Sequence, residues 1–194
     1  MSTIVTLFLV IVGVIVAFAV LLGLYALMLY NKMIGLRNRV QNAWAQIDVQ
    51  LQRRLDLIPN IVETVKGYAK HEAETLQVVV AARNMAISAG KNGSQQQQIE
   101  ANNMLTGALK SLFALAEAYP DLKANQNYLQ LQEELSQTED KISYMRQSYN
   151  DVVMNYNTTI QRFPAMFFAR MFGFFDSPMY QADAGAAQPP KVSF

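Results

Sequence analysis

Residues 36–65 read LRNRVQNAWAQIDVQLQRRLDLIPNIVETV, and the spacing of their apolar side chains predicts a helix. These side chains recur every three or four positions, as on one face of an α-helix. The stripe consists of Leu36, Val40, Trp44, Ile47, Leu51, Leu55, Ile58, Val62 and Val65. Pro59 interrupts it, and either kinks one long helix or lies in the first turn of a new helix that has Asp56 as its N-cap.

The segment that precedes this stripe, residues 1–31, is predicted to be a transmembrane anchor. It contains no charged side chain, and residues 4–29 are apolar except for Thr6 and two glycines. At about 1.5 Å per residue, such a helix exceeds the roughly 30 Å hydrocarbon core of a bilayer. A cleaved signal peptide is disfavoured, because no Lys or Arg precedes the apolar run and the run is too long.

The charges that flank the anchor predict its orientation. Lys32, Arg37 and Arg39 follow the apolar run, and only the α-amino group precedes it. The positive-inside rule then predicts a single-pass protein of the cell (inner) membrane, with the N-terminus outside and the helical domain in the cytoplasm.

The anchor also contains two pairs of small residues at helical spacing, Gly13 with Ala17 and Ala19 with Gly23. Small residues let membrane helices approach one another closely. Glycine and alanine are also common in membrane helices, so both a packing contact and ordinary composition remain open.

Composition argues against several classes of function. The formal net charge of +1 gives no strong field for a nucleic acid, and the chain has no cysteine for a disulfide, a thiolate metal site or a nucleophile. His71 is the only histidine and lacks the partners of a di-iron or zinc-protease site. We therefore expect no catalytic residue, no metal and no cofactor, and a protein that is not an enzyme.

The rest of the chain also reads as helical. Gly90 to Gly93 is a break, and Ser94 with Gln97 forms a capping box that starts the next helix. Pro120-Asp121 ends that helix, and a last long helix runs from about residue 125 to Arg162. Strand-type alternation is missing, so the predicted fold class is all-α.

Charged residues on these helices are candidates for interhelical ion pairs and caps. Such pairs would fix the register of a helical bundle. Acid–base chemistry by paired carboxylates is the less favoured alternative. The residues singled out for register and caps are Asp48, Arg53, Arg54, Asp56, Pro59, Glu139 and Arg146.

Residues 163–180 form a segment rich in Phe and Met, and residues 181–194 are predicted to be a flexible tail. Three placements of the segment stay open: in the membrane interface, against another subunit, or docked on the same chain. Its key residues are Phe167, Phe168, Phe172, Phe174 and Phe175.

The ordered motifs of this chain resemble the LemA family. They include Ala43-Trp44, Ile47 to Leu51, Asp56 to Asn60, Tyr119 to Asn125, Thr138 to Ile142 and Tyr149-Asn150. The resemblance implies an N-terminal transmembrane helix and, in residues 32–162, an antiparallel four-helix bundle. It also implies a chain reversal near residues 54–57, and membrane-organising roles such as those of relatives in bacterial internal-membrane organelles, but no settled biochemical activity.

Two functions are expected from these features. The first is a self-associating, membrane-anchored scaffold that organises membrane or partner proteins, with the lipid bilayer and further copies of the chain as partners. The second is a membrane-tethered adaptor or sensor that binds an unknown protein partner through the bundle or the C-terminal tail.

Overall fold

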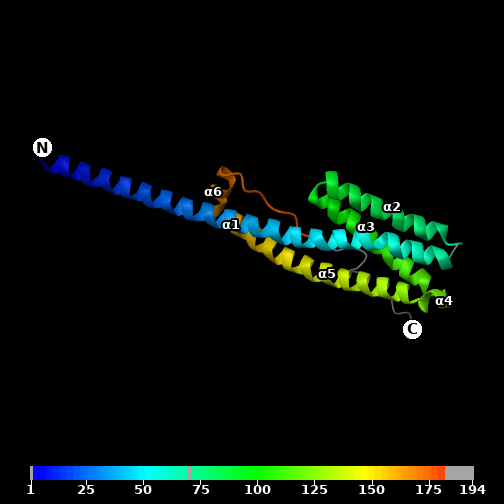
Figure 1. Ribbon diagram of the computed structural model, residues 1–194. Helices are drawn as coiled ribbons and strands as arrows, with labels where there is room; N and C mark the ends of the chain where they lie inside the picture. Colours follow the sequence, from blue (N-terminus) through cyan, green and yellow to red (C-terminus); the bar gives the residue numbers. More distant parts are fainter. Residues whose placement is uncertain (1, 70, 182–194) are drawn as a thin grey trace, which may run out of the picture. The chain divides into compact units, whose positions relative to one another are not determined.

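The computed structural model describes residues 2–69 and 71–181, and all regular structure within them is helical (Figure 1). The helices are α1 (Ser2–Tyr68), α2 (Ala73–Asn92), α3 (Gln95–Ala116), α4 (Pro120–Lys123), α5 (Gln126–Gln161) and α6 (Ala165–Met171). The predicted all-α class is confirmed. Except for Gln181, the predicted flexible tail lies outside the described residues.

The chain divides into two compact units, which we call the first and the second unit. The first unit comprises residues 1–42 and 151–177, and the second comprises residues 43–150 and the chain from residue 178 onward. Helices α1 and α5 each contribute residues to both units.

Helix α1 is a single helix of 67 residues with Pro59 inside it, and Figure 1 shows it without a break. The expected chain reversal near residues 54–57 is therefore wrong, and so is the alternative that Asp56 caps a new helix. The chain instead turns between Tyr68 and Ala73, after the apolar stripe has continued through Val65. Continuous burial of that stripe favours one uninterrupted helix over a turn at residues without glycine.

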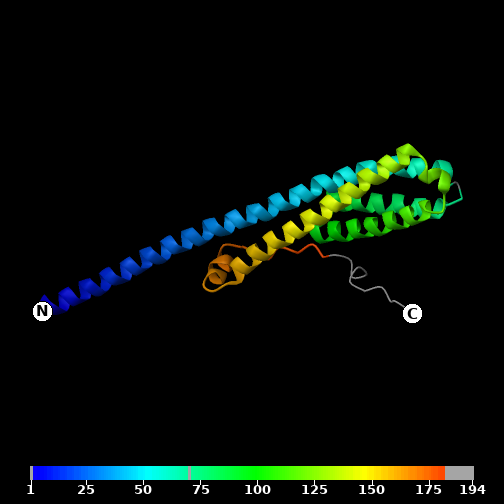
Figure 2. The same cartoon turned by 90° about the horizontal axis from the view of Figure 1, so that it is seen from below.

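In the second unit, α2, α3 and parts of α1 and α5 pack around one core, to which the short α4 adds Leu122, and the successive long stretches run in opposite directions (Figure 2). Two hydrogen bonds fix how α2 lies along its neighbours. Arg83 of α2 donates to the Leu55 carbonyl of α1, and at the start of α2 the Tyr119 hydroxyl donates to Glu72. The predicted antiparallel bundle is thus present here in part. The predicted stripe supplies its α1 wall, with Ile47, Ile58 and Val65 fully buried.

Helix boundaries in this unit follow local sequence signals. Ser94 accepts a hydrogen bond from the Gln97 backbone amide, and the Gln97 side chain accepts one from the Ser94 amide, so the predicted capping box is confirmed. Helix α5 begins at Gln126 and ends at Gln161, within a residue of the expected ends.

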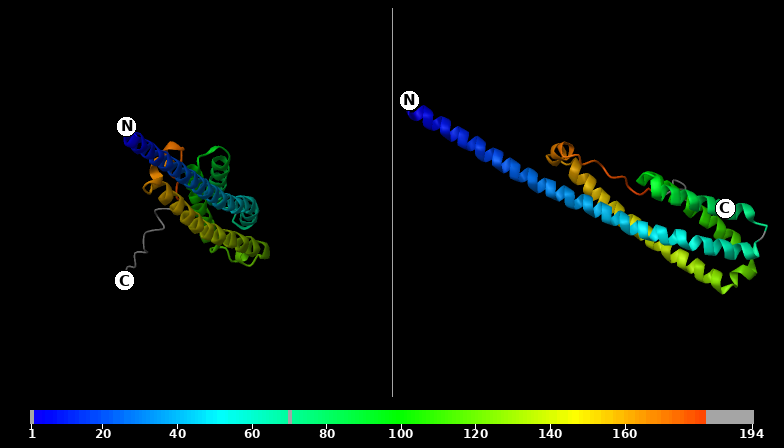
Figure 3. Two further views of the ribbon diagram at one scale, coloured as in Figure 1. Left: turned by 90° about the vertical axis from the view of Figure 1, so that its left-hand side faces the viewer. Right: turned by 45° about the horizontal axis from the view of Figure 1, so that its top comes forward.

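In the first unit, α6 (orange in Figure 3) and the residues that follow it as far as Phe174 pack on α1 through aromatic rings. Phe168 lies 6.5 Å from Tyr25 between ring centroids, and Phe172 lies 5.1 Å from Tyr30. The small side chains of Ala165 and Ala169 are the buried ones on α6.

The N-terminal part of α1 presents its apolar side chains to the outside. Within the described residues, α1 is the one helix long and apolar enough to cross a membrane, and no part of its most apolar window is buried. Length and composition therefore fit a membrane span, as the sequence predicts.

Candidate functional site

The centre of the second unit holds a fully buried arginine, Arg54 of α1. Its Nη1 donates to Glu139 Oε2 of α5 at 2.7 Å and to Thr106 Oγ1 of α3 at 2.9 Å. Its Nη2 donates to Asn102 Oδ1 at 2.7 Å and to the Asn102 carbonyl at 3.3 Å. One guanidinium thus joins three helices. The structure brings together Arg54 and Glu139, which the sequence had singled out for register.

A charge in this position stabilises the fold only if its geometry is nearly complete, because taking an ion out of water is costly. Four hydrogen bonds satisfy the two terminal nitrogens, while Nε has no partner among the described residues. Glu139 keeps a side-chain exposure of 34%, so its carboxylate reaches solvent at the edge of the bundle. The Arg54 cluster is therefore buried at one end and open at the other.

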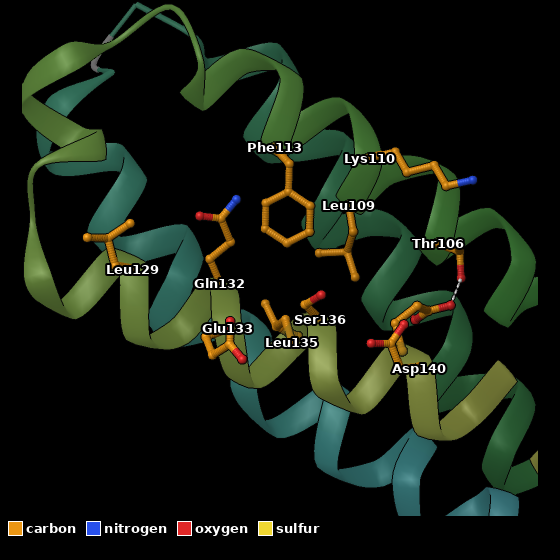
Figure 4. Close-up of a pocket in the computed structure, with 11 residues that line it drawn as sticks. Thr106, Leu109, Lys110, Phe113, Leu129, Gln132, Glu133, Leu135, Ser136 and Asp140 are labelled. Carbon is orange, nitrogen blue, oxygen red and sulfur yellow. Dashed lines mark hydrogen bonds between the residues drawn. The ribbon is translucent and has the colours of Figure 1, made fainter. Parts of the chain in front are cut away.

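The open end of the Arg54 cluster faces a groove of about 540 Å³ between α3 and α5. Thr106 and Glu139 line this end, and the Thr106 hydroxyl lies 3.2 Å from Glu139 Oε1. Figure 4 shows Thr106 and Asp140 at one end of the groove and Leu129 at the other, with Phe113 between the two helices.

The groove combines an apolar floor with a mainly acidic rim. Leu109, Phe113 and Leu135 supply carbon surface, while Glu133, Asp140 and Lys110 stand on the rim (Figure 4). Apolar surface with a few convergent polar groups is the usual composition of a binding site. The arrangement supplies apolar surface flanked by charged side chains.

A second interhelical contact explains how α1 passes through Pro59. Proline has no N–H, so the usual bond from residue 59 to the Leu55 carbonyl cannot form. Arg83 Nε of α2 donates to that carbonyl at 2.8 Å. The interruption in α1 is thereby compensated by a side chain from the neighbouring helix, and Pro59 sits within the helix rather than at its start.

The other predicted register residues take different places. Arg53 lies 4.0 Å from Glu134 at the surface, and Asp56 accepts a hydrogen bond from Gln52 within α1. Asp48 lies at the edge of a recess that Lys91 also lines, and partial burial raises the pKa of its carboxyl. Arg146 forms no ion pair with a described residue, and its guanidinium lies 4.3 Å above the Tyr180 ring.

Tyr180 belongs to an aromatic cluster in the second unit. Its ring lies 6.1 Å from Trp44, and Trp44 lies 5.5 Å from Tyr149 in an edge-on arrangement. Burial raises the pKa of Tyr149 to about 12 and also raises the pKa of Tyr180. Trp44 therefore packs against other rings, as its place on the apolar stripe predicts.

Two Tyr-Asn pairs on α5 form hydrogen bonds with the backbone of residues 175–180, which follow α6 without helical structure. The sequence did not indicate this role. In the second unit, Tyr149 donates to the Pro178 carbonyl at 2.8 Å. Asn150 pairs with both the N–H and the C=O of Tyr180, at 2.7 and 2.9 Å. An asparagine amide can pair in this way with any residue's backbone.

The first unit repeats the arrangement one heptad later along α5. Tyr156 donates to the Phe175 carbonyl at 3.0 Å, and Asn157 pairs with both backbone groups of Ser177, each at 2.9 Å. The dipeptide Tyr-Asn at positions 149–150 and 156–157 is a visible signal. Without the fold, nothing indicates that its partner is backbone 20 to 30 residues downstream.

The remaining candidates lie in the first unit. Gly13, Ala17, Ala19 and Gly23 are exposed on α1, and a Cβ added at either glycine meets nothing within 4 Å. Of the aromatic segment, Phe168, Phe172 and Phe174 contact α1, while Phe167 and Phe175 are exposed.

Metal-binding chemistry finds no support in the part of the chain that the structure describes. No group of three or more His, Asp or Glu side chains there is placed to hold a metal ion. His71 is exposed in the turn before α2.

Together these features define an all-α protein that has one helix fit to span a membrane and a helical bundle tied by a buried arginine. A family model described as the LemA family matches residues 43–194. The chain belongs to the LemA family.

Curated relatives match most of this chain at modest identity. Protein LemA of Metamycoplasma hominis is 28% identical over 153 residues, which cover 78% of this chain and 68% of the relative. Magnetosome protein MamQ 2 of Paramagnetospirillum magneticum is 25% identical over 186 residues, 84% of this chain and 68% of the relative. Magnetosome protein MamQ of Magnetospirillum gryphiswaldense is 28% identical over 171 residues, which cover 76% of this chain and 63% of the relative.

Proposed function

We propose that this protein is a membrane-anchored helical scaffold, which self-associates in the bilayer and organises membrane or partner proteins at its cytoplasmic face. The observation that carries the proposal is the exposure of α1: every described side chain from Val5 to Tyr25 is exposed, and the large ones are aliphatic or aromatic. In water, such a surface is strongly unfavourable; in lipid, it is the surface that a spanning helix presents.

Continuity of α1 supports a scaffold. The helix that presents this apolar surface also supplies Arg54 and the apolar stripe of the second unit, with no linker between the two parts. A non-catalytic role is consistent with a groove that offers surface and charge. Two relatives are named magnetosome proteins, and as part of the proposal we extend an association with a cellular structure from them to this chain.

Fractionation and mass measurement test the scaffold. Membranes that contain the full-length protein are washed in alkaline carbonate, and the detergent-extracted particle is then weighed by light scattering coupled to size exclusion. We expect the protein to stay in the pellet and the particle to contain more than one chain. Release by carbonate contradicts the anchor, and a monomer contradicts self-association.

Orientation has its own test. Because the chain has no cysteine, a single one can be introduced at Ser2 or at exposed Tyr144 and treated with a membrane-impermeant maleimide on intact spheroplasts. We expect Ser2→Cys to be labelled and Tyr144→Cys to be labelled only after lysis. The reverse pattern contradicts the proposed topology.

The groove between α3 and α5 favours a second candidate function, that of an adaptor for a protein partner. A photocrosslinking amino acid at Gln132, which lines the groove, is compared with one at Tyr144, which is outside it. A discrete adduct to one other protein from position 132 alone supports the adaptor. An adduct to a second copy of this chain supports the scaffold instead.

A further inference from the structure

Three rings of the Phe- and Met-rich segment pack against α1 near the end of its apolar run. Phe168 contacts Tyr25, and Phe172 and Phe174 contact Tyr30, with ring centroids 5.1 to 6.5 Å apart. Tyr25 and Tyr30 close the apolar run, and Lys32 is the first charged residue after it. Helix α6 is therefore docked where the apolar surface of α1 gives way to charge, which in a spanning helix is the level of the lipid head groups.

One face of α6 differs from that of a helix in a water-soluble protein, because it exposes large apolar side chains. The small side chains of α6 are inside, with Ala169 only 2% exposed. Phe168 packs its ring on α1, but three other large apolar side chains are outside. Phe167 and Met171 of α6 and Phe163 just before it recur at intervals of four residues and are 61%, 67% and 80% exposed. A helix that faces water normally buries its large apolar residues, so this face requires a covering surface.

Charge in the first unit indicates what covers that face. The unit contains five basic side chains, Lys32, Arg37, Arg39, Arg162 and Arg170, and two acidic ones, Asp151 and Asp176. Because the whole chain has a net charge of +1, this unit carries a formal +3 and the rest of the chain −2. Arg162 and Arg170 flank the exposed rings and are themselves exposed. Anionic lipid head groups attract basic side chains placed in this way, and the acyl chains of the same lipids surround apolar rings that insert beside them.

We propose that α6 is a second membrane contact, in which Phe163, Phe167 and Met171 insert into the leaflet beside α1 while Arg162 and Arg170 bind anionic phospholipid head groups. The inference rests on the proposed membrane anchor and deepens it. The protein then holds the bilayer at two points, through a spanning helix and through a short interfacial helix brought back to it by α5.

The test measures depth in the membrane for the full-length protein in vesicles of phosphatidylcholine and phosphatidylglycerol. Because no cysteine is present, Phe167→Cys, Phe18→Cys and Tyr144→Cys each take one environment-sensitive fluorophore. Phe18 lies in the apolar run of α1, and Tyr144 is an exposed aromatic residue of the second unit. Fluorescence is quenched by lipids that carry a nitroxide either near the head group or deep in the acyl chain, and separately by aqueous iodide.

We expect severalfold stronger quenching of the position-167 probe by the shallow nitroxide than of the position-144 probe, with the position-18 probe responding to the deep nitroxide. Quenching at position 18 together with a position-167 probe that responds only to iodide overturns the interfacial contact and leaves the anchor standing. A position-167 probe shielded from both nitroxide and iodide overturns it in favour of a second copy of the chain. No lipid quenching at position 18 defeats the anchor itself.

Discussion

At the scale of single residues, the second unit depends on a charge in its interior. Arg54 is fully buried, and its four side-chain hydrogen bonds reach acceptors on α3 and α5. An apolar side chain would avoid the cost of desolvating a charge but would not select one register among several. We infer that Arg54 favours the one register in which Asn102, Thr106 and Glu139 all lie within hydrogen-bonding distance of its guanidinium.

Arg54→Ala should therefore destabilise the fold strongly, by about 3–5 kcal/mol, because Glu139 and Asn102 lose the donor around which they are arranged. The measurement is urea unfolding of the full-length protein in a fixed detergent, followed by circular dichroism. Its neighbour Arg53 is the matched control: that side chain is 47% exposed and 4.0 Å from Glu134. Arg53→Ala should cost less than about 1 kcal/mol. Equal effects of the two substitutions would contradict a special role for Arg54.

Tyr149 gives a prediction about pH. Burial raises the pKa of Tyr149 to about 12, whereas an unfolded chain ionises its tyrosines near pH 10. Above that pH the unfolded state loses the Tyr149 proton first. The contribution of Tyr149 to the free energy of unfolding is therefore fully present below about pH 10 and is lost as the pH rises towards 12. Burial also raises the pKa of Tyr128, Tyr156 and Tyr180, so the absorbance of tyrosinate at alkaline pH should show a late phase that Tyr149→Phe makes smaller. An unchanged late phase in Tyr149→Phe would contradict the raised pKa of this residue.

At the scale of elements, α1 is held together partly from outside. Local sequence rules treat Pro59 as a kink or a helix start, because they account only for bonds within one helix. The Leu55 carbonyl that Pro59 leaves free is instead satisfied by Arg83, which is 28 residues away in the chain. No rule that reads α1 alone predicts this donor.

Arg83→Met should cost about 1–3 kcal/mol, since it removes the donor from a partly buried carbonyl. In a Pro59→Ala background the amide at position 59 can bond Leu55 directly, so the same change should cost measurably less. Urea unfolding of the four proteins completes a double-mutant cycle. Purely additive effects would mean that Arg83 does not compensate for the proline.

At the scale of the whole molecule, the proposed self-association depends on the lipid-facing surface of α1. Gly13 and Gly23 leave open space around them within this chain. Gly13→Leu with Gly23→Leu should therefore leave the fold intact and lower the particle mass in detergent, if the small pairs let two copies approach. Val14→Leu, exposed beside Gly13, is the control. An unchanged mass in the double variant would exclude this surface from the contact.

Periodicity and composition alone determined much of this protein. The stripe from Leu36 to Val65, the capping box at Ser94 and the limits of α5 follow from helix period and capping chemistry, which act over a few neighbouring residues. The apolar run of residues 4–29 is likewise a property of consecutive side chains. Such signals are local, so the chain shows them without its fold.

Tertiary structure alone decided the turn after Tyr68, the partner of Pro59 and the meeting of Arg54 with Asn102, Thr106 and Glu139. It also decided which rings of the aromatic segment pack on α1 and which remain exposed. These outcomes depend on which surfaces come together between residues far apart in the chain, from 28 residues for Arg83 with Leu55 to 85 for Arg54 with Glu139, and further still for the rings on α1. Hydrogen bonding and packing at such separations are set by three-dimensional complementarity, which no local spacing encodes.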